Sequence, residues 1–570
     1  MPSKTLAHQL WRNYAEAPDK NILYLLYNRQ PDQAITYRDL VQGSLGYAKA
    51  LDKAGIRPGE VVILILQHGA PLIYAFFGAI LHGAIPSIMP FLTEKLSPEQ
   101  YRRSLAALFQ ITVPSAVITY PDFKSEVLQA MGESEVDGPS SVRSLLQHTD
   151  IFPSTEIEFS DLQGLKRSSD EIVLLQHSSG TTGLQKGVAL SHQAIFNQLS
   201  SYSQALQITP EEVVVSWLPL YHDMGLIAGF LMPILLQIPL VLMSPLDWVR
   251  APYRLFQAVS HYRGTLTWLP NFAYNFCAQK IRERDLEGVN LSSWRAVINC
   301  SEPMYFKSHQ MFLARFQTYG LKSSALATCY AMAENVFAVS QGGITSPVTI
   351  DRIDPKIYFQ VRKAVPIQGD ETGLPMVSAG FPLANTRVCI LDDGRQELPE
   401  RHIGEIAIQS DCILNGYYNR PDVTAQAFHN NWYLTGDLGY LADGEIYITG
   451  RKKDLIIVGG KNIYPQDLES LTSEVPGVHP GRVAAFGVFN EDAGTEDVVI
   501  LAEAEDEKWM VPEARDALSN EIRLRINRGS DIALRYVKIV ERGWLLKTSS
   551  GKVTRRANRE KYLAEMRKSD

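Results

Sequence analysis

The densest run of chemistry-bearing residues is LLQHSSGTTGLQKGVALSH, from Leu174 to His192. An apolar strand is expected to end in a loop of Ser, Thr and Gly, followed by Lys186 and a second apolar run. Glycines let the backbone approach an anion closely, while hydroxyl and amide groups donate hydrogen bonds to phosphate oxygens. The loop lacks the Gly-Lys-Ser/Thr ending of a Walker A motif. It is therefore either another kind of phosphate-binding loop or a plain surface turn.

Further motifs follow along the chain: WLPLYHDMGL from Trp217, NCSEPM from Asn299, CYAMAEN from Cys329, YLTGDLG from Tyr433, GRKKDLIIVGGKNIYPQDLE from Gly450 and KTSSGKVTR from Lys547. Each has an ordinary structural interpretation when it is taken alone. Tyr330 would be a core aromatic, Glu334 a surface charge and Asp437 a turn residue between glycines. The sequence contains no GxSxG, HExxH or GxGxxG pattern that would indicate a competing chemistry.

In this order the motifs resemble those of the adenylate-forming superfamily, which includes acyl-CoA synthetases, luciferases, peptide-synthetase adenylation domains and fatty acyl-AMP ligases. The resemblance spans most of the chain. It implies ATP and Mg²⁺ as cofactors. A carboxylate oxygen would attack the α-phosphorus of ATP, pyrophosphate would leave, and an acyl adenylate would form without a protein nucleophile.

The resemblance also assigns roles to residues. The implied phosphate-binding set is Ser178, Ser179, Gly180, Thr181, Thr182, Gly183 and Lys186. Tyr330 is expected to pack against adenine, and Glu334 to coordinate magnesium as an oxygen ligand. Asp437 is expected to accept hydrogen bonds from the ribose hydroxyls, with the assistance of Arg451.

Two further roles concern motion and catalysis. Lys453 occupies the position at which relatives pivot their small lobe between two functional states. Lys552 resembles the mobile catalytic lysine, whose charge neutralises the carboxylate and α-phosphate oxygens as they meet. His222, in YHDMGL, is the remaining candidate catalytic residue.

Some residues depart from the superfamily pattern. Cys300 and Ser301 stand where relatives carry a Gly-Ala-Glu-Pro-like adenine wall, so the adenine contacts of Ser301 are in question. We interpret Cys300 as a packed thiol, because no neighbouring base would activate it. Ala331 replaces a usual Gly, and Ala333 replaces a Thr in a way that fatty acyl-AMP ligases share.

Two features favour a fatty acyl-AMP ligase. Peptide-synthetase domains carry an Asp directly after the aromatic residue of YHDMGL to bind an amino group, and here that position holds His222. Residues 351–375 are a surplus relative to acyl-CoA synthetases and resemble the insertion of fatty acyl-AMP ligases, which is thought to hinder the use of coenzyme A. The alternatives are a long- or medium-chain acyl-CoA synthetase and a non-catalytic nucleotide- or lipid-binding homologue.

The expected acyl acceptor is the phosphopantetheine arm of an acyl carrier protein, or of a polyketide or peptide synthetase carrier domain, acting in trans. Carrier proteins tend to be acidic, and the sequence RRANR begins at Arg555. We therefore expect the carrier to dock near Arg555, Arg556 and Arg559.

These motifs need a scaffold, and the pattern of the chain indicates an α/β fold. Short apolar runs such as VVILIL (from Val61), SAVITY and RAVIN alternate with longer helical patterns, which is typical of parallel sheets covered by helices. A hairpin is expected around Asp443-Gly444. We expect a large N-terminal adenylation lobe of several α/β subdomains over residues 1–452, and a small hinged α/β lobe over residues 453–570.

Composition sets outer limits on function. The chain has 570 residues, 45% of them hydrophobic, and a formal net charge of −7, which argues against a general nucleic-acid binder. Its five cysteines show no metal-ligand or disulfide spacing, which favours a reducing cytoplasm. The apolar run from Leu226 to Met243 contains Pro233, Gln237 and Pro239, so we expect a buried helix leading into a buried strand, not a membrane span.

Overall fold

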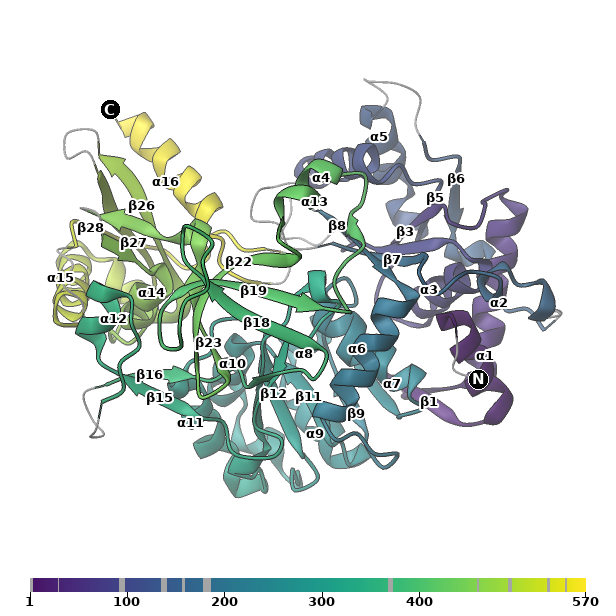
Figure 1. Ribbon diagram of the computed structural model, residues 1–570, viewed down its shortest axis with the longest axis horizontal. Coiled ribbons are helices and arrows are strands. Elements are labelled where there is room, and N and C mark those ends of the chain that lie inside the picture. The colour runs from purple at the N-terminus through teal and green to yellow at the C-terminus, as the bar shows by residue number, and fades with distance from the viewer. Residues whose placement is uncertain are drawn as a thin grey trace.

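The computed structural model describes residues 4–28, 30–91, 98–134, 141–155, 159–177, 186–367, 373–458, 461–490, 495–529, 534–548 and 551–569. Figure 1 shows one large body of purple, blue and teal elements, with the yellow C-terminal elements gathered beside it. Helices pack on several parallel and mixed sheets throughout. The expected α/β class is confirmed.

The largest sheet has seven strands in the order β13-β12-β11-β9-β10-β1-β2. Their bounds are β1 Asn21–Leu26, β2 Gln33–Thr36, β9 Val214–Ser216, β10 Leu240–Met243, β11 Leu266–Leu269, β12 Ala296–Cys300 and β13 Leu326–Cys329. All neighbouring pairs are parallel except β1–β2. The carboxyl ends of β9 to β13 therefore meet along one edge, which is where α/β sheets bind ligands.

A second parallel sheet, β4-β3-β5-β6, forms from β3 Val61–Ile65, β4 Ile85–Ile88, β5 Ala116–Thr119 and β6 Ser144–Gln147. The strand and helix expected at Val61 and beyond are β3 and α3 (Ala70–His82). The other helices of this region are α1 Leu6–Glu16, α2 Tyr37–Lys53, α4 Pro98–Thr112 and α5 Lys124–Ser134. The central strands are buried over their whole length because helices cover both faces, which explains their unbroken apolar runs.

The strand before the Ser/Thr/Gly loop is β7 (Ile172–His177), and the apolar run after it is β8 (Gly187–Ser191). The two pair antiparallel, and β20 (Gly416–Tyr417) adds to the far side of β8. Ser178 to Gly183, the predicted phosphate ligands, lie outside the described residues. Lys186 is the member of that set whose position is known.

The long apolar segment is buried inside the large body. It forms a π-helix, η6 (Met224–Leu231), a short helix, α7 (Met232–Leu235), and then strand β10. Every residue of these three elements is buried. The expected helix followed by a buried strand is confirmed, and no helix in the described part of the chain is long and apolar enough to span a bilayer.

An antiparallel sheet follows, made of β18 Thr386–Leu391, β19 Gly404–Ser410, β21 Phe428–His429, β22 Trp432–Ala442 and β23 Glu445–Arg451. Strands β22 and β23 form the hairpin expected around Asp443-Gly444. Both turn residues have positive φ (+52° and +79°), which is the conformation that an Asp-Gly turn favours.

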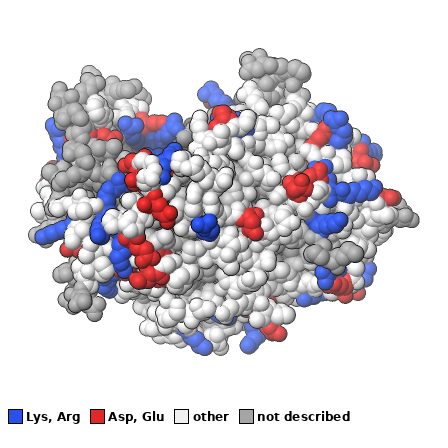
Figure 2. All heavy atoms as spheres, in the orientation of Figure 1, with Lys and Arg blue, Asp and Glu red and all other residues white. Residues whose placement is uncertain are grey.

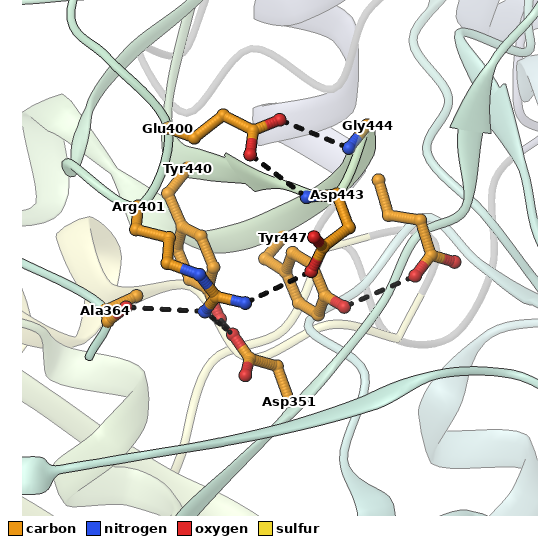
Figure 3. A network of polar contacts seen from close by, with 9 residues as sticks. Asp351, Ala364, Glu400, Arg401, Tyr440, Asp443, Gly444 and Tyr447 are labelled. Carbon is orange, nitrogen blue, oxygen red and sulfur yellow. Dashed lines mark hydrogen bonds and ion pairs between the residues drawn. The ribbon is translucent and has the colours of Figure 1, made fainter. Parts of the chain in front are cut away.

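The predicted insertion forms a small unit of its own. Strands β15 (Ile350–Ile353) and β16 (Leu374–Val377) pair antiparallel, and helix α12 (Pro355–Val361) lies between them in the sequence. Figure 3 shows how the unit is held: Asp351 accepts hydrogen bonds from Arg401 (2.9 Å) and from the hydroxyl of Tyr440 on β22 (2.8 Å). The backbone oxygen of Ala364 also faces the Arg401 guanidinium. The insertion is therefore anchored to the β22–β23 hairpin.

The C-terminal elements are β24 Ile456–Val458, β25 Lys461–Ile463, α14 Pro465–Ser473, β26 Val478–Asn490, β27 Thr495–Ala504, α15 Pro512–Gly529, β28 Tyr536–Val540 and α16 Arg555–Ser569. Sheet β26-β27-β28 and its helices share an apolar core that includes Leu468, Ile500 and Ile522. On the face shown in Figure 2, basic and acidic side chains are interspersed. The small α/β lobe thus has a core of its own.

Candidate active site

Lys552 reaches the carboxyl edge of the large sheet. Its turn is closed by the Thr548 amide, which donates to the Lys552 carbonyl (2.8 Å), and Gly551 supplies the positive φ of +87° that the turn needs. The Lys552 Nζ donates to the backbone oxygen of Ser301 (2.5 Å), directly after β12. A lysine of the small lobe therefore contacts the strand edge at which a ligand is expected.

Ser301 itself adopts a positive φ of +67°, an uncommon conformation for a serine. Its Oγ lies 3.8 Å from the Met224 sulfur at the start of η6. Cys300 is fully buried in β12, as expected for a packed thiol. Burial also raises the pKa of its cross-strand neighbour Cys329 well above that of a free thiol. Neither cysteine is suited to act as a nucleophile.

His222 is half-buried and lies close to Lys552. Burial, together with the Lys552 charge, lowers the pKa of His222 to about 3, so the imidazole is neutral at physiological pH. Its Nε2 has no hydrogen-bond partner within the described ranges. The adjacent Asp223 caps η6 by accepting from the Met224 amide (2.8 Å), and burial raises its pKa. The two residues offer a neutral hydrogen-bonding imidazole and a carboxyl group beside the lysine.

Tyr330, Asp437 and Arg451 meet as a second group. The Tyr330 hydroxyl, at the end of β13, donates to Asp437 Oδ2 (2.7 Å), and Arg451 Nε lies 2.9 Å from Asp437 Oδ1. Register explains the ion pair, because Asp437 and Arg451 are cross-strand partners on β22 and β23. The charge of Asp437 raises the pKa of Arg451, and burial raises the pKa of Tyr330.

Glu334 and Lys186 form the third group around a tyrosine. The Tyr417 hydroxyl donates to Glu334 Oε1 (3.0 Å) and lies 2.9 Å from the Tyr433 hydroxyl. The Lys186 ammonium stands 4.7 Å from the centroid of the Tyr417 ring. Sequence reasoning missed Tyr417, because its strand β20 is joined to β8 only by the fold. Tyr433 opens the YLTGDLG motif and could have been singled out there.

The three groups lie within electrostatic reach of one another. The Glu334 carboxylate is one of the charges that raise the pKa of Asp223 and of Arg451, and Lys552 acts on His222 and Asp223. The structure therefore brings Lys186, His222, Ser301, Tyr330, Glu334, Asp437, Arg451 and Lys552 to one edge of the large sheet. Such a cluster of positive and negative groups suits a nucleotide whose phosphates meet a carboxylate.

Lys453 lies in the short 3₁₀ turn Lys452–Asp454 that follows β23. Burial and the neighbouring Arg451 lower its pKa. Lys452 beside it pairs with Glu405 on β19 (3.0 Å), and Asp454 pairs with Arg555 (2.7 Å). The predicted pivot thus sits between an anchor on the large body and an anchor on the small lobe.

The expectation that a carrier docks near Arg555, Arg556 and Arg559 stays a prediction, and within the fold Arg555 already has acidic partners. Its guanidinium is bidentate to Glu469 (2.8 and 2.7 Å) and bonds Asp454 as well. Arg559 donates to the Gly487 carbonyl (2.8 Å), and Arg556 pairs with Glu560 on the exposed side of α16. Of the three arginines, Arg556 is exposed, whereas Arg555 and Arg559 are partly buried.

Comparison with known proteins agrees with this geometry. The family model described as "AMP-binding enzyme" matches residues 10–418. The medium-chain-fatty-acid–[acyl-carrier-protein] ligase JamA of Moorena producens is 29% identical over 97% of this chain and 94% of its own. The putative fatty-acid–CoA ligase FadD21 of Mycobacterium tuberculosis is 29% identical over 95% and 98%.

A solved structure from a study of fatty acyl-adenylate ligases of E. coli and L. pneumophila superposes with a TM-score of 0.87, at 26% identity and 98% coverage of both chains. The family model covers most of the chain, and the superposition includes both lobes. The chain belongs to the AMP-binding enzyme family.

Proposed function

We propose that the protein activates a fatty acid as its acyl adenylate and transfers the acyl group to the phosphopantetheine thiol of a carrier protein. The observation that carries the proposal is the contact of Lys552 Nζ with Ser301 at the carboxyl end of β12. This contact brings the Lys552 ammonium beside His222 and Asp223, and Asp223 is also within electrostatic reach of Glu334. The JamA relative, named as a fatty acid–carrier ligase, supports the same substrate classes.

In the first half-reaction a carboxylate oxygen of the fatty acid attacks the α-phosphorus of ATP, and the bond to the β-phosphate oxygen breaks as pyrophosphate leaves. Two anionic groups must meet, so charge compensation is the main task of the protein. The Lys552 ammonium would contact both groups, and its hydrogen bond to the Ser301 carbonyl supports this role. His222, being neutral, can donate a hydrogen bond without adding charge.

The nucleoside would be held by the second group. Asp437 would accept the ribose hydroxyls, with Arg451 keeping its carboxylate in place (2.9 Å). Tyr330 is buried at the end of β13 and offers its ring to adenine, while Ser301 borders the same edge. Lys186 would contact the β- and γ-phosphates together with Ser178 to Gly183.

The residues present suit Mg²⁺ bound through the nucleotide. Magnesium is commonly held by one or two carboxylates together with substrate phosphates. Glu334 supplies one carboxylate, whose Oε1 is oriented by Tyr417 (3.0 Å). The described residues contain no cluster of three or more His, Cys, Asp or Glu that could hold a metal without phosphates. When bound, the ion would neutralise the leaving pyrophosphate.

The second half-reaction requires Lys552 to leave, because the carrier thiol must reach the acyl carbonyl. The pivot would be Lys453, which lies between the Lys452–Glu405 and Asp454–Arg555 pairs. The carrier thiol then attacks the acyl carbonyl carbon. The bond from this carbon to the phosphate oxygen breaks, and AMP leaves with its electron pair. All five cysteines are free thiols, which suits a protein that works in a reducing compartment.

An acyl-CoA synthetase is the second candidate, favoured by the name of the FadD21 relative. The test is incubation with magnesium-ATP and fatty acids of graded length under three conditions. Coenzyme A is added, or a carrier protein that bears a free phosphopantetheine arm, or neither. The products are identified by mass spectrometry. We expect acyl-AMP that persists with coenzyme A and is consumed by the carrier. Efficient acyl-CoA formation would replace the carrier proposal, and absence of any acyl-AMP would leave a non-catalytic homologue.

A further inference from the structure

The described chain contains four buried tryptophans, Trp217, Trp248, Trp268 and Trp294, all close to the large sheet. Two of them have hydrogen-bond acceptors built into the fold. The Trp268 indole donates to the Tyr202 hydroxyl (2.7 Å), and the Trp294 indole donates to the Thr267 hydroxyl (3.0 Å). The fold thus supplies a hydroxyl where a buried indole N–H needs one, as is usual for tryptophan.

Trp217 and Trp248 are different. Their rings stack at 3.6 Å with an interplanar angle of 6°, and the side chains are 5% and 0% exposed. Neither Nε1 has a hydrogen-bond partner among the residues that the structure describes. A buried donor without an acceptor costs free energy, and a native protein that retains two side by side calls for an explanation.

The position of the stack suggests what the acceptor is. Trp217 directly follows β9, and Trp248 lies in α8 (Pro245–Arg250), which directly follows β10. Phe272, at the start of α10 (Asn271–Lys280), packs edge-on against both tryptophans. Its backbone amide donates to the Glu302 carboxylate (2.9 Å), one residue beyond the Ser301 that Lys552 contacts. The stack therefore borders the reaction centre at the ends of β9, β10 and β11.

The nucleotide and the acyl chain must occupy opposite parts of this edge. Tyr330 and Ser301, with Asp437 and Arg451, place the nucleotide at the ends of β12 and β13. An acid whose carboxylate lies at Lys552 then extends its tail away from that side, toward Trp217 and Trp248. This step rests on the proposed adenylation.

We propose that the stacked pair recognises an oxygen on the acyl chain, and that the preferred substrate is a hydroxy- or oxo-substituted fatty acid. A hydroxyl or keto oxygen would accept a hydrogen bond from Trp217 Nε1 or Trp248 Nε1, while the faces of the rings and Phe272 contact the methylenes. An unsubstituted acid would leave both donors unpaired. Sites that hydrogen-bond a substrate group discriminate strongly against the analogue that lacks it.

The experiment compares kcat/KM for pyrophosphate release with decanoic acid and with its singly hydroxylated and oxo-substituted isomers. We expect the wild-type protein to prefer at least one substituted isomer by roughly 10- to 100-fold over decanoic acid. Trp217→Phe and Trp248→Phe retain an aromatic ring and remove one donor each, so at least one of them should abolish that ratio. Trp294→Phe, whose indole has its own acceptor, is the matched control and should keep the ratio.

Three outcomes would overturn the inference. Decanoic acid could be the best substrate of the wild-type protein, the ratio could survive both Phe variants, or the variants could lower turnover of every acid in parallel. The last result would make the stack a packing element only. Formation of acyl-AMP without any preference leaves the proposed function intact, whereas no acyl-AMP from any acid removes the proposed function as well.

Discussion

Single residues carry most of the proposed chemistry, and Lys552 gives the sharpest test. Replacing it with Ala removes the ammonium that contacts Ser301 and leaves the nucleotide group of Tyr330, Asp437 and Arg451 in place. We expect acyl-adenylate formation to fall by roughly 10²–10³-fold while ATP binding persists. Pyrophosphate release and calorimetric titration with ATP measure the two quantities.

The matched control is Lys508→Ala, an exposed lysine of the same lobe that pairs only with Asp506 among the described acidic groups. It should change neither quantity, since exposed pairs contribute little. Equal loss of adenylation in both variants would mean that the effect comes from the lobe as a whole, and unchanged turnover of Lys552→Ala would remove the mechanism.

Asp437 provides a second test at this scale. Asp437→Asn keeps the shape of the side chain but removes the charge that Arg451 faces at 2.9 Å. A hydrogen bond to a charged group contributes about 1.5–3 kcal/mol, so KM for ATP should rise about tenfold or more, with little effect on the fatty acid. Asp443→Asn, in the exposed turn of the same hairpin, is the control. A rise in KM for the acid instead would place Asp437 elsewhere in the site.

Sequence reasoning found the residues that sit in ordered motifs, because each motif is contiguous and its spacing is fixed by one loop or hairpin. It could not find Tyr417, which reaches Glu334 only through the pairing of β20 with β8. It also gave no sign that Glu469 and Asp454 surround Arg555, because a basic residue in a polar tail looks like any exposed charge. Trp248 gave no signal in the sequence, because its stacking partner comes from another strand end.

At the scale of elements, the insertion depends on one buried carboxylate. Asp351 on β15 accepts hydrogen bonds from Arg401 and from the Tyr440 hydroxyl. It therefore links β15 to β22 and to the loop before β19 (Figure 3). Asp351→Ala should leave the Tyr440 hydroxyl without this acceptor and Arg401 with only its longer contacts to Ala364 and Asp443, and should lower the free energy of unfolding by about 1–3 kcal/mol. Thermal or urea unfolding measures the change.

Asp393→Ala is the control, because that carboxylate is 79% exposed and pairs only loosely, with Lys452 at 3.5 Å and Arg362 at 3.8 Å. It should unfold like the wild-type protein. If Asp351→Ala has full stability but converts acyl-AMP to acyl-CoA more readily, the insertion acts on thiol access without being a structural support. If neither the stability nor the acyl-CoA formation changes, the network in Figure 3 contributes to neither property.

At the scale of the whole molecule, the sheets and lobes were predictable because apolar periodicity reports burial, and burial determines which strands lie inside. The contact between the lobes was not predictable. It joins three elements that are distant in the sequence: α14, the segment before α11 (Phe306–Phe316), and the insertion. The Tyr305 hydroxyl donates to the Gln466 carbonyl (3.5 Å), and the rings of Tyr358 and Tyr464 lie 5.6 Å apart. These contacts hold the small lobe in the orientation that places Lys552 at Ser301.

Asp467 on α14 lies inside this contact, with its Oδ2 buried and unpaired among the described residues. Burial raises its pKa from 3.8 to about 7, with Glu469 adding to the shift and Arg555 opposing it. Tyr305, Tyr358 and Tyr464 also face it, and burial raises the pKa of all three, so they stay neutral in this range. Asp467 is therefore the group facing this contact that titrates near neutrality.

The sign of the pH effect follows from linkage. A carboxyl with a raised pKa in the docked state stabilises that state fully below about pH 4, and this contribution is lost as the pH rises through about 7, at about 1.4 kcal/mol per pKa unit. We expect limited proteolysis near Lys453 to be faster at about pH 8 than at about pH 6. Asp467→Asn should flatten that dependence, whereas Asp506→Asn, exposed on the small lobe, should retain it. A wild-type cleavage rate that is constant over this range, or that falls with rising pH beyond the intrinsic response of the protease, would show that Asp467 does not control docking of the lobes.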